Sequence, residues 1–224
     1  MKKYNLEIAC FNPESAVIAQ ENGANRVELC AEMNEGGTTP SYEDVIATRE
    51  KLTIDMNVMI RPRGGNFVYS DAEFEQMKQE IKAYKELKVD GFVFGILNKD
   101  NSINVRQNKE LVTLAKPLPC TFHRAFDVVS DVYNSLETVI ECGFKTILTS
   151  GQEPNVVKGI SVLEQLAKKA GDRIVIMPGG GVRSSNVAML KEKMNTTFYH
   201  SSAITDGTET ADGKEVENLV ANLK

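Results

Sequence analysis

The sequence of 224 residues lacks the features that mark nucleic-acid-binding and membrane proteins. Its 26 Lys and Arg and 31 Asp and Glu are interspersed, so no block of positive charge is available for a phosphate backbone. No stretch approaches the roughly 18 consecutive apolar residues that a membrane helix needs. Glu7 interrupts the segment near the start in which a signal peptide would have its apolar core. We therefore expect neither nucleic acid nor a membrane as a partner.

Cysteine is also scarce. The four residues are too few for a disulfide scaffold, and none of their spacings is the Cys-x-x-Cys spacing of a zinc site. They are Cys10, Cys30, Cys120 and Cys142. We expect a reduced, cytoplasmic protein in which the cysteines either pack in the core or contribute to a site.

Short β-branched or aliphatic runs alternate with helical stretches along the whole chain. The runs predict eight strands, at Leu6–Cys10, Arg26–Cys30, Asn57–Arg61, Gly91–Leu97, Cys120–Arg124, Thr146–Ser150, Arg173–Met177 and Thr196–Ser201. The intervening stretches predict helices at Pro13–Asn22, Tyr42–Leu52, Ala72–Leu87, Val105–Ala115, Val132–Cys142, Val157–Ala170 and Ser185–Lys193, with a final helix at Gly213–Leu223. Helix N-caps are expected at Asn12, Ser41, Ser70 or Asp71, Ser130 or Asp131, and Ser184.

The strands start about 27 residues apart on average, which is the length of one strand–loop–helix–loop unit. Eight such units without a linker predict an α/β fold, a single (β/α)8 TIM barrel over residues 1–224. A doubly wound open sheet, which usually has fewer strands, is the alternative.

Polar residues are expected inside this barrel at the C-terminal ends of its strands, where TIM barrels hold their sites. Alternation along each strand, with the aliphatic residues facing the helices, points a set of side chains inward. They are Glu7, Glu28, Cys30, Met59, Arg61, His123 and His200. Each of them taken singly is compatible with a structural ion pair or a packed core residue. Together they cost desolvation free energy that packing does not require, so the pattern predicts a polar pocket.

The strongest local motif runs from Met177 through Gly179-Gly180-Gly181 to Arg183. Glycines let a ligand approach the backbone, and free N–H groups at a helix start favour an anion. Barrels frequently bind phosphate in the loops after strands seven and eight. A tight turn without a ligand is the alternative. The candidate anion-binding residues are Arg61, Arg63, Arg124, Asp127, Ser150, Gly179, Gly180, Gly181, His200 and Ser201.

Cys10 and Cys30 close two neighbouring strands, whereas Cys120 and Cys142 are expected to be packing residues remote from the site. Neighbouring strands lie ~4.8 Å apart. Two thiolates at that separation suit a soft ion such as Cu(I), with Met59 or a histidine as a further ligand. Strict alternation puts Cys10 on the strand face opposite to that of the inward residues, so it has to reach the site from beyond the strand end.

These residues lie in stretches that resemble the copper homeostasis protein CutC family from the first strand to the seventh. The matching stretches are Glu7–Cys10, Gly23–Cys30, Glu35–Ser41, Val58–Ser70, Asp90–Gly95, Thr121–Asp127, Ile147–Gly151 and Ile176–Gly181. The resemblance implies a cytoplasmic TIM barrel linked to copper handling, in which Cys10 and Cys30 match proposed Cu(I) ligands. Two residues depart from the family pattern. Asn66 stands where Asp is common, and Ser201 stands where some relatives have Cys, which removes a third possible thiol.

Two functions follow from these patterns. The leading hypothesis is copper binding or trafficking, with Cu(I) held by Cys10 and Cys30. The alternative is a TIM-barrel enzyme acting on a small anionic or phosphorylated metabolite. Its acid–base residues are Glu7, Glu28 and His123. A deep Glu/Arg/His pocket exceeds what a copper carrier needs and favours the enzyme, whereas the resemblance favours copper. The expected partner is thus a copper ion or a small anionic molecule, and a homo-oligomer is compatible with the sequence.

Overall fold

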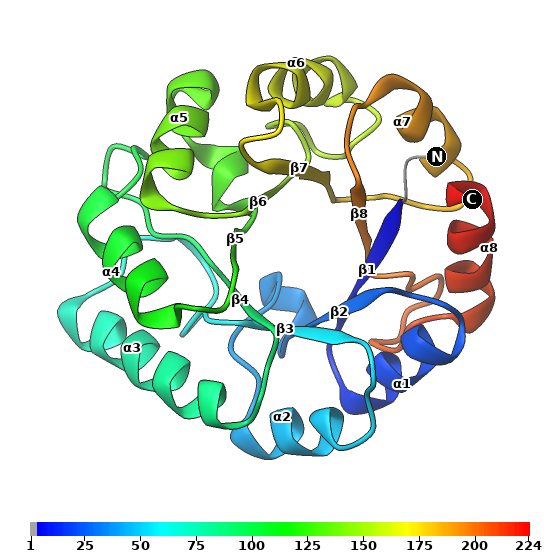
Figure 1. Ribbon diagram of the computed structural model, residues 1–224, viewed down its shortest axis with the longest axis horizontal. Helices are drawn as coiled ribbons and strands as arrows, with labels where there is room; N and C mark the ends of the chain where they lie inside the picture. Colours follow the sequence, from blue (N-terminus) through cyan, green and yellow to red (C-terminus); the bar gives the residue numbers. More distant parts are fainter. Residues whose placement is uncertain (1–3) are drawn as a thin grey trace.

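The computed structural model describes residues 4–224, in which a central ring of strands is surrounded by helices (Figure 1). The strands are β1 (Asn5–Cys10), β2 (Arg26–Leu29), β3 (Asp55–Met59), β4 (Gly91–Phe94), β5 (Cys120–Phe122), β6 (Thr146–Thr149), β7 (Val175–Pro178) and β8 (Phe198–Ser201). The helices are α1 (Pro13–Glu21), α2 (Tyr42–Arg49), α3 (Asp71–Glu86), α4 (Val105–Ala115), α5 (Val132–Cys142), α6 (Ile160–Ala170), α7 (Val187–Lys193) and α8 (Gly213–Leu223). Two 3-10 helices, η1 (Met33–Glu35) and η2 (Arg124–Val128), follow β2 and β5.

All strand pairs are parallel, and the hydrogen-bonded order is β7-β6-β5-β4-β3-β2-β1-β8. Strand β7 also lies against β8, so the sheet forms a nearly closed barrel with the helices outside it (Figure 1). The predicted (β/α)8 TIM barrel is confirmed, because an open doubly wound sheet would keep its first and last strands apart.

The helices begin where short polar side chains can accept hydrogen bonds from free backbone N–H groups. Asn12, Ser41 and Asp131 cap α1, α2 and α5 as predicted. Ser70 and Glu73 form a reciprocal capping box at the start of α3.

One predicted cap is wrong. Asn186, not Ser184, precedes α7. The Ser184 hydroxyl and backbone N–H both donate to the carboxylate of Glu215, at 2.7 Å each. Glu215 lies on α8, 31 residues further along the chain. The Ser184 hydroxyl therefore forms a tertiary hydrogen bond with Glu215 and does not cap α7.

Several predicted elements are also shorter in the structure than the sequence patterns suggested. Strand β5 ends at Phe122, and His123 begins the 3-10 turn η2 instead of continuing the strand. Helix α6 begins at Ile160, three residues after its predicted start at Val157. The hydrophobic residues continue into the adjoining loops, so the sequence pattern is longer than the helix or strand itself.

Buried side chains form two layers. The larger layer lies between the strands and the helices and includes fully buried Ile8, Phe92 and Tyr199. A small cluster of Cys30, Met59 and Val93 is separate from it. Among residues 4–224, every helix is too short or too polar to cross a bilayer.

Candidate functional site

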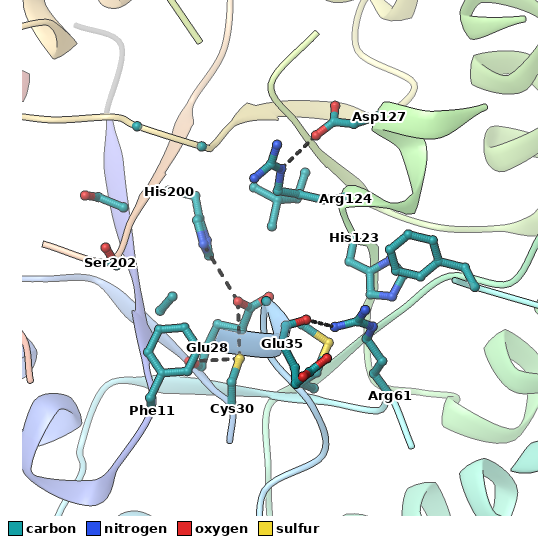
Figure 2. Close-up of a pocket in the computed structure, with 18 of the residues that line it drawn as sticks. Phe11, Glu28, Cys30, Glu35, Arg61, His123, Arg124, Asp127, His200 and Ser202 are labelled. Atoms are coloured by element: carbon teal, nitrogen blue, oxygen red, sulfur yellow. Dashed lines mark hydrogen bonds and ion pairs between the residues drawn. The ribbon is translucent and has the colours of Figure 1, made fainter. Parts of the chain in front are cut away.

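A cavity of about 430 Å³ opens at the C-terminal ends of the strands (Figure 2). Of the seven side chains predicted to face inward, six line it, namely Glu28, Cys30, Met59, Arg61, His123 and His200. The seventh, Glu7, lies two residues earlier on β1 than Ala9, a lining residue, and is fully buried. The cavity is therefore polar, and Glu7 supports it from beneath.

Glu7 is held by ionic partners from the two strands beside it. Its Oε2 accepts a hydrogen bond from Arg26 Nε at 2.5 Å, and its Oε1 lies 2.8 Å from His200 Nδ1. Register explains these contacts, since Arg26 on β2 and His200 on β8 are the residues paired with Glu7. Burial raises the pKa of Glu7, but the charge of Arg26 and the His200 contact outweigh it and lower that pKa to about 2.

The pKa of Glu28 shifts in the opposite direction to that of Glu7. Burial is the largest cause that raises its pKa, to about 7, and the nearby carboxylate of Glu7 adds to it against the attraction of His200. The Glu28 Oε2 atom is 3.5 Å from Cys30 Sγ and 3.7 Å from His200 Nε2 (Figure 2). Two buried carboxylates thus share one imidazole, and only one of them is strongly acidic.

The trio of Glu7, Glu28 and His200 could in principle hold a metal, because one ligand atom from each lies within 4.8 Å of the others. The contacts argue against this use. Both carboxylate oxygens of Glu7 already face cationic or polar partners, and Arg26 adds a positive charge beside them. Although burial opposes a charged imidazole, the two carboxylates outweigh it and raise the pKa of His200. With both of its oxygens engaged, Glu7 offers no free carboxylate oxygen to a metal ion at this position.

His123 lies at the end of β5 and is 3% exposed. Its Nδ1 accepts a hydrogen bond from the Ala125 backbone N–H at 3.2 Å, so the ring proton is on Nε2. Burial, helped by the charge of Arg61, lowers the pKa of His123 to about 3. This histidine is therefore neutral at physiological pH.

Arg61 and Arg63 are both tied to loops. Arg61 Nη1 donates to the backbone carbonyls of Glu35 and Gly37 at 2.6 and 2.8 Å, and Nη2 donates to Gly65 at 3.0 Å. Arg63 forms an ion pair with Glu73 at 2.5 Å and donates to Val68. Arg61 therefore joins the loop after β2 to the loop after β3, and Arg63 organises the loop after β3. Of these two residues, only Arg61 lines the cavity.

The loops after β5, β6 and β7 meet on the far side of the cavity. Asp127 accepts hydrogen bonds from Arg124 Nε at 2.7 Å and from the Ser150 backbone and hydroxyl at 2.9 and 3.0 Å. Arg124 Nη2 also donates to the Ser150 hydroxyl at 3.1 Å. Asp127 therefore positions Arg124, which lines the cavity together with Gly180 and Gly181 (Figure 2).

Arg183 also lines the cavity and was missed as a candidate. Its Nη1 donates to the Ser201 hydroxyl at 3.1 Å, and its Nη2 donates to the Ile204 carbonyl at 3.0 Å. The signal was its place at the end of the motif that runs from Met177 through the three glycines. Ser201 in turn donates to the Val182 carbonyl at 2.7 Å, so it joins the β7 and β8 loops.

Gly179 is required by close packing. A Cβ atom there would lie 2.3 Å from Leu148 Cδ1 and 3.2 Å from His200 Cδ2. The next residue, Gly180, has a φ of +99°, a conformation that other residues rarely adopt. The glycine motif thus leaves space for the His200 ring and brings the backbone to the cavity edge.

The sequence model of the CutC family matches residues 4–205. The chain belongs to the CutC family. It is 50% identical over 200 residues to a family protein CutC of Parabacteroides distasonis, covering 88% of this chain and 82% of the relative. It is 43% identical over 198 residues to the copper homeostasis protein cutC homolog of Homo sapiens, covering 88% and 72%.

Solved structures agree with the CutC assignment. A CutC structure from Streptococcus agalactiae has a TM-score of 0.84 at 35% identity and covers 89% of this chain and 98% of that chain. Phosphoribosyl anthranilate isomerase of Thermotoga maritima has a TM-score of 0.69 at 15% identity, covering 98% of both chains. The second likeness shows a common fold alone.

The cysteines of this CutC chain occupy different layers. Cys30 lines the cavity, in the cluster with Met59 and Val93. Cys10 packs in the layer between strands and helices, and its Sγ lies 3.4 Å from the Ile8 carbonyl oxygen. The two residues are joined through the backbone, where the Cys30 N–H donates to the Cys10 carbonyl at 2.8 Å. Cys120 and Cys142 are buried in the outer layer.

Proposed function

We propose that this CutC-family chain binds Cu(I) in the barrel mouth through the sulfur atoms of Cys30 and Met59. The observation that carries the proposal is that the Cys30 and Met59 side chains both lie beside Gly37. A Cβ at Gly37 would lie 3.4 Å from Cys30 Sγ and 3.6 Å from Met59 Cε. Thiolate and thioether sulfurs are soft ligands that suit Cu(I). The names of the vertebrate relatives, copper homeostasis protein cutC homologs, support the choice of metal.

Two further residues bear on this site. His200 lines the same cavity, but Glu28 and Glu7 raise the pKa of its imidazole, so the ring has to lose a proton before its Nε2 can bind the ion as a third ligand. Cys10 is the second thiol expected from the sequence. To reach the same ion, it has to leave the layer between β1 and the helices, a rearrangement that the Cys30–Met59 pair does not need.

Competition with the Cu(I) chelator bicinchoninate under anaerobic conditions tests this proposal. Cys30→Ser is expected to weaken Cu(I) binding at least about tenfold, and Met59→Leu by a smaller factor, because each removes a ligand without much change of volume. Cys142→Ser is the matched control, since this thiol is buried in the outer layer. Equal affinity in all four proteins contradicts a copper site in the cavity. Loss of affinity in Cys10→Ser instead would favour the two-cysteine site.

A different observation supports a second function. Three buried polar atoms of cavity-lining side chains have no hydrogen-bond partner within residues 4–224, namely Glu28 Oε1, Arg61 Nε and His123 Nε2. Buried polar atoms in folded proteins are nearly always hydrogen-bonded, so these three favour a polar ligand. The second candidate function is therefore an enzyme acting on a small anionic or phosphorylated metabolite. Glu28 is its acid–base residue, and Arg124 binds the anion.

Thermal unfolding in the presence of a panel of phosphorylated sugars tests the second function. A ligand at 100 times its dissociation constant stabilises a protein by ~2.7 kcal/mol, which is readily measured. Glu28→Gln is expected to retain binding of each hit and to lose its turnover, because the amide keeps the shape but cannot exchange a proton. Unchanged turnover in Glu28→Gln contradicts its acid–base role.

A further inference from the structure

We infer that the cavity receives Cu(I) as a complex with a small thiol that carries carboxylate groups. The ion binds at the copper site proposed above, on which this step rests, and the carboxylates bind Arg124 and Arg183 at the rim of the cavity. Three features of the cavity support this ligand, namely its supply of sulfur, its size and the charges at its rim.

The cavity offers a single thiol. Of the four cysteines, only Cys30 lines it, whereas Cys10, Cys120 and Cys142 pack in the layer between strands and helices. Met59 adds a thioether sulfur. Thiolates are the soft ligands that select Cu(I) most strongly. One thiolate and one thioether therefore leave a place on the ion for a thiolate from outside the chain.

The cavity has the size of a small-molecule site. Its volume of about 430 Å³ falls within the range of ~300–1,000 Å³ that is typical of such sites. Cys30 lies on one side of it and Arg124 on the other, with Glu28 and His200 between them (Figure 2). Glu28 Oε2 is 3.5 Å from Cys30 Sγ and 3.7 Å from His200 Nε2. A molecule with a short carbon chain therefore has room between the sulfur atoms and the rim.

Arg183, on the loop after β7, is a cation without a carboxylate partner among residues 4–224. Its Nη1 donates to the Val182 carbonyl and the Ser201 hydroxyl, and its Nη2 donates to the Ile204 carbonyl. No hydrogen bond joins its Nε to any residue in this part of the chain. The side chain is half-buried and lines the cavity. A partly buried charge without a counter-ion favours an anionic ligand.

Arg124 supplies a second cation, on the turn after β5. Asp127 and Ser150 hold its Nε and Nη2, while no hydrogen bond joins its Nη1 to any residue from 4 to 224. The Arg124 side chain is 46% exposed, so a ligand in the cavity can reach it. Guanidinium groups bind carboxylates through charge-assisted hydrogen bonds. The rim after β5 and β7 thus presents two guanidinium groups to the carboxylates of the thiol.

Entry of the ion is a ligand exchange in which copper stays Cu(I). In solution the ion is bound by two thiolates of the small thiol. The Cys30 sulfur forms a bond to copper as one of these thiolates leaves, and the leaving thiolate takes up the proton of the Cys30 thiol. The other thiolate stays on the ion beside Met59, and its carboxylates bind the rim. The charge of the copper complex is unchanged by this exchange.

Native mass spectrometry under anaerobic conditions tests the inference with two probes, 6-mercaptohexanoate and 6-mercaptohexan-1-ol, mixed in equal amounts with Cu(I). The two thiols share one flexible carbon chain and differ in having a carboxylate or a hydroxyl at its end. The unmodified protein is expected to retain copper together with a thiol, with the carboxylate thiol in at least about tenfold excess over the alcohol. This comparison needs no variant, so it does not depend on whether a substituted protein folds.

Variants then assign the contacts. Arg124→Gln and Arg183→Gln are each expected to reduce the preference for the carboxylate thiol at least about threefold. Cys30→Ser is expected to lose both the copper and the thiol. Arg173→Gln is the matched control, because Arg173 forms an exposed ion pair with Glu137 outside the cavity.

The outcomes separate this inference from the proposed copper site. Copper retained without a thiol, both thiols retained in equal amounts, or a preference that survives in both arginine variants refutes the inference and leaves the copper site standing. Copper and thiol retained in Cys30→Ser lie elsewhere and refute both. Absence of copper from every mixture refutes the copper site itself.

Discussion

His200 and Glu7 are 193 residues apart in the sequence, yet His200 Nδ1 lies 2.8 Å from Glu7 Oε1 where β8 pairs with β1. This contact joins the last strand of the barrel to the first in its interior. Arg26, on the other neighbour of β1, completes a row of three charged or polar groups across adjacent strands. The row is buried, so its charges depend on one another rather than on water.

We expect Glu7→Gln to destabilise the fold by about 3 kcal/mol, because removing one partner leaves Arg26 poorly compensated in a buried site. Urea unfolding followed by circular dichroism measures this change. Glu137→Gln, which removes the carboxylate of an exposed ion pair with Arg173, is the control and should leave the midpoint unchanged. A Glu7→Gln protein as stable as its parent would show that the row does not stabilise the barrel.

The Glu7 carboxylate also makes the stability of the fold depend on pH. Its pKa is about 2 in the folded protein and 4.5 ordinarily, so the folded state holds the charged form more strongly. The stability contributed by Glu7 is therefore complete above about pH 4.5 and is lost as pH falls toward 2. Unfolding free energies measured across this range should fall more steeply for the parent than for Glu7→Gln. Parallel curves would contradict the assignment.

Glu28 has the opposite pH dependence. Burial raises its folded pKa to about 7, above the ordinary 4.5, so the folded state prefers the protonated acid. As pH rises from 4.5 to 7, this residue lowers the stability of the fold, and above pH 7 its effect is constant. Glu28→Gln should therefore gain stability relative to the parent as pH rises through this interval. A difference that does not change with pH would show that the acid is not perturbed.

Much of the architecture follows from periodicity in the sequence. The bounds of α4, α5 and α8 match their predicted ranges, and alternation along the strands identified six of the cavity-lining residues. Periodicity reports which face a side chain occupies. It does not report what that side chain contacts. For this reason the strands and helices were predicted better than the contacts of individual residues.

Three residues illustrate the limit. Arg61 was expected to face an anion, but three of its hydrogen bonds go to backbone carbonyls of two loops. Ser184 is bonded to a carboxylate on the last helix. Arg183 reaches the cavity because the loop after β7 curves toward β8. Each contact is set by loop geometry that only the closed barrel determines.

Gly179→Ala tests the packing beneath His200. The added methyl would lie 2.3 Å from Leu148 Cδ1, so we expect a loss of about 1–3 kcal/mol in stability from overpacking. Gly207→Ala is the matched control, because a Cβ there meets no atom within 4 Å. Thermal unfolding of both variants measures the difference, and equal melting temperatures would show that Leu148 moves aside freely.

The two histidines of the chain should titrate in opposite directions. Burial and the charge of Arg61 lower the pKa of His123 to about 3, whereas Glu28 and Glu7 raise the pKa of His200 despite its burial. Nitrogen-15 NMR of the imidazole rings should therefore show one ring that stays neutral, with its proton on Nε2, from pH 5 to 8. The other ring should titrate above pH 6.5, the ordinary value. His123→Phe removes the neutral signal and so assigns both. A neutral ring protonated on Nδ1, or a His123 that titrates near pH 6.5, would contradict the hydrogen bond from the Ala125 N–H to its Nδ1 and the burial of the ring.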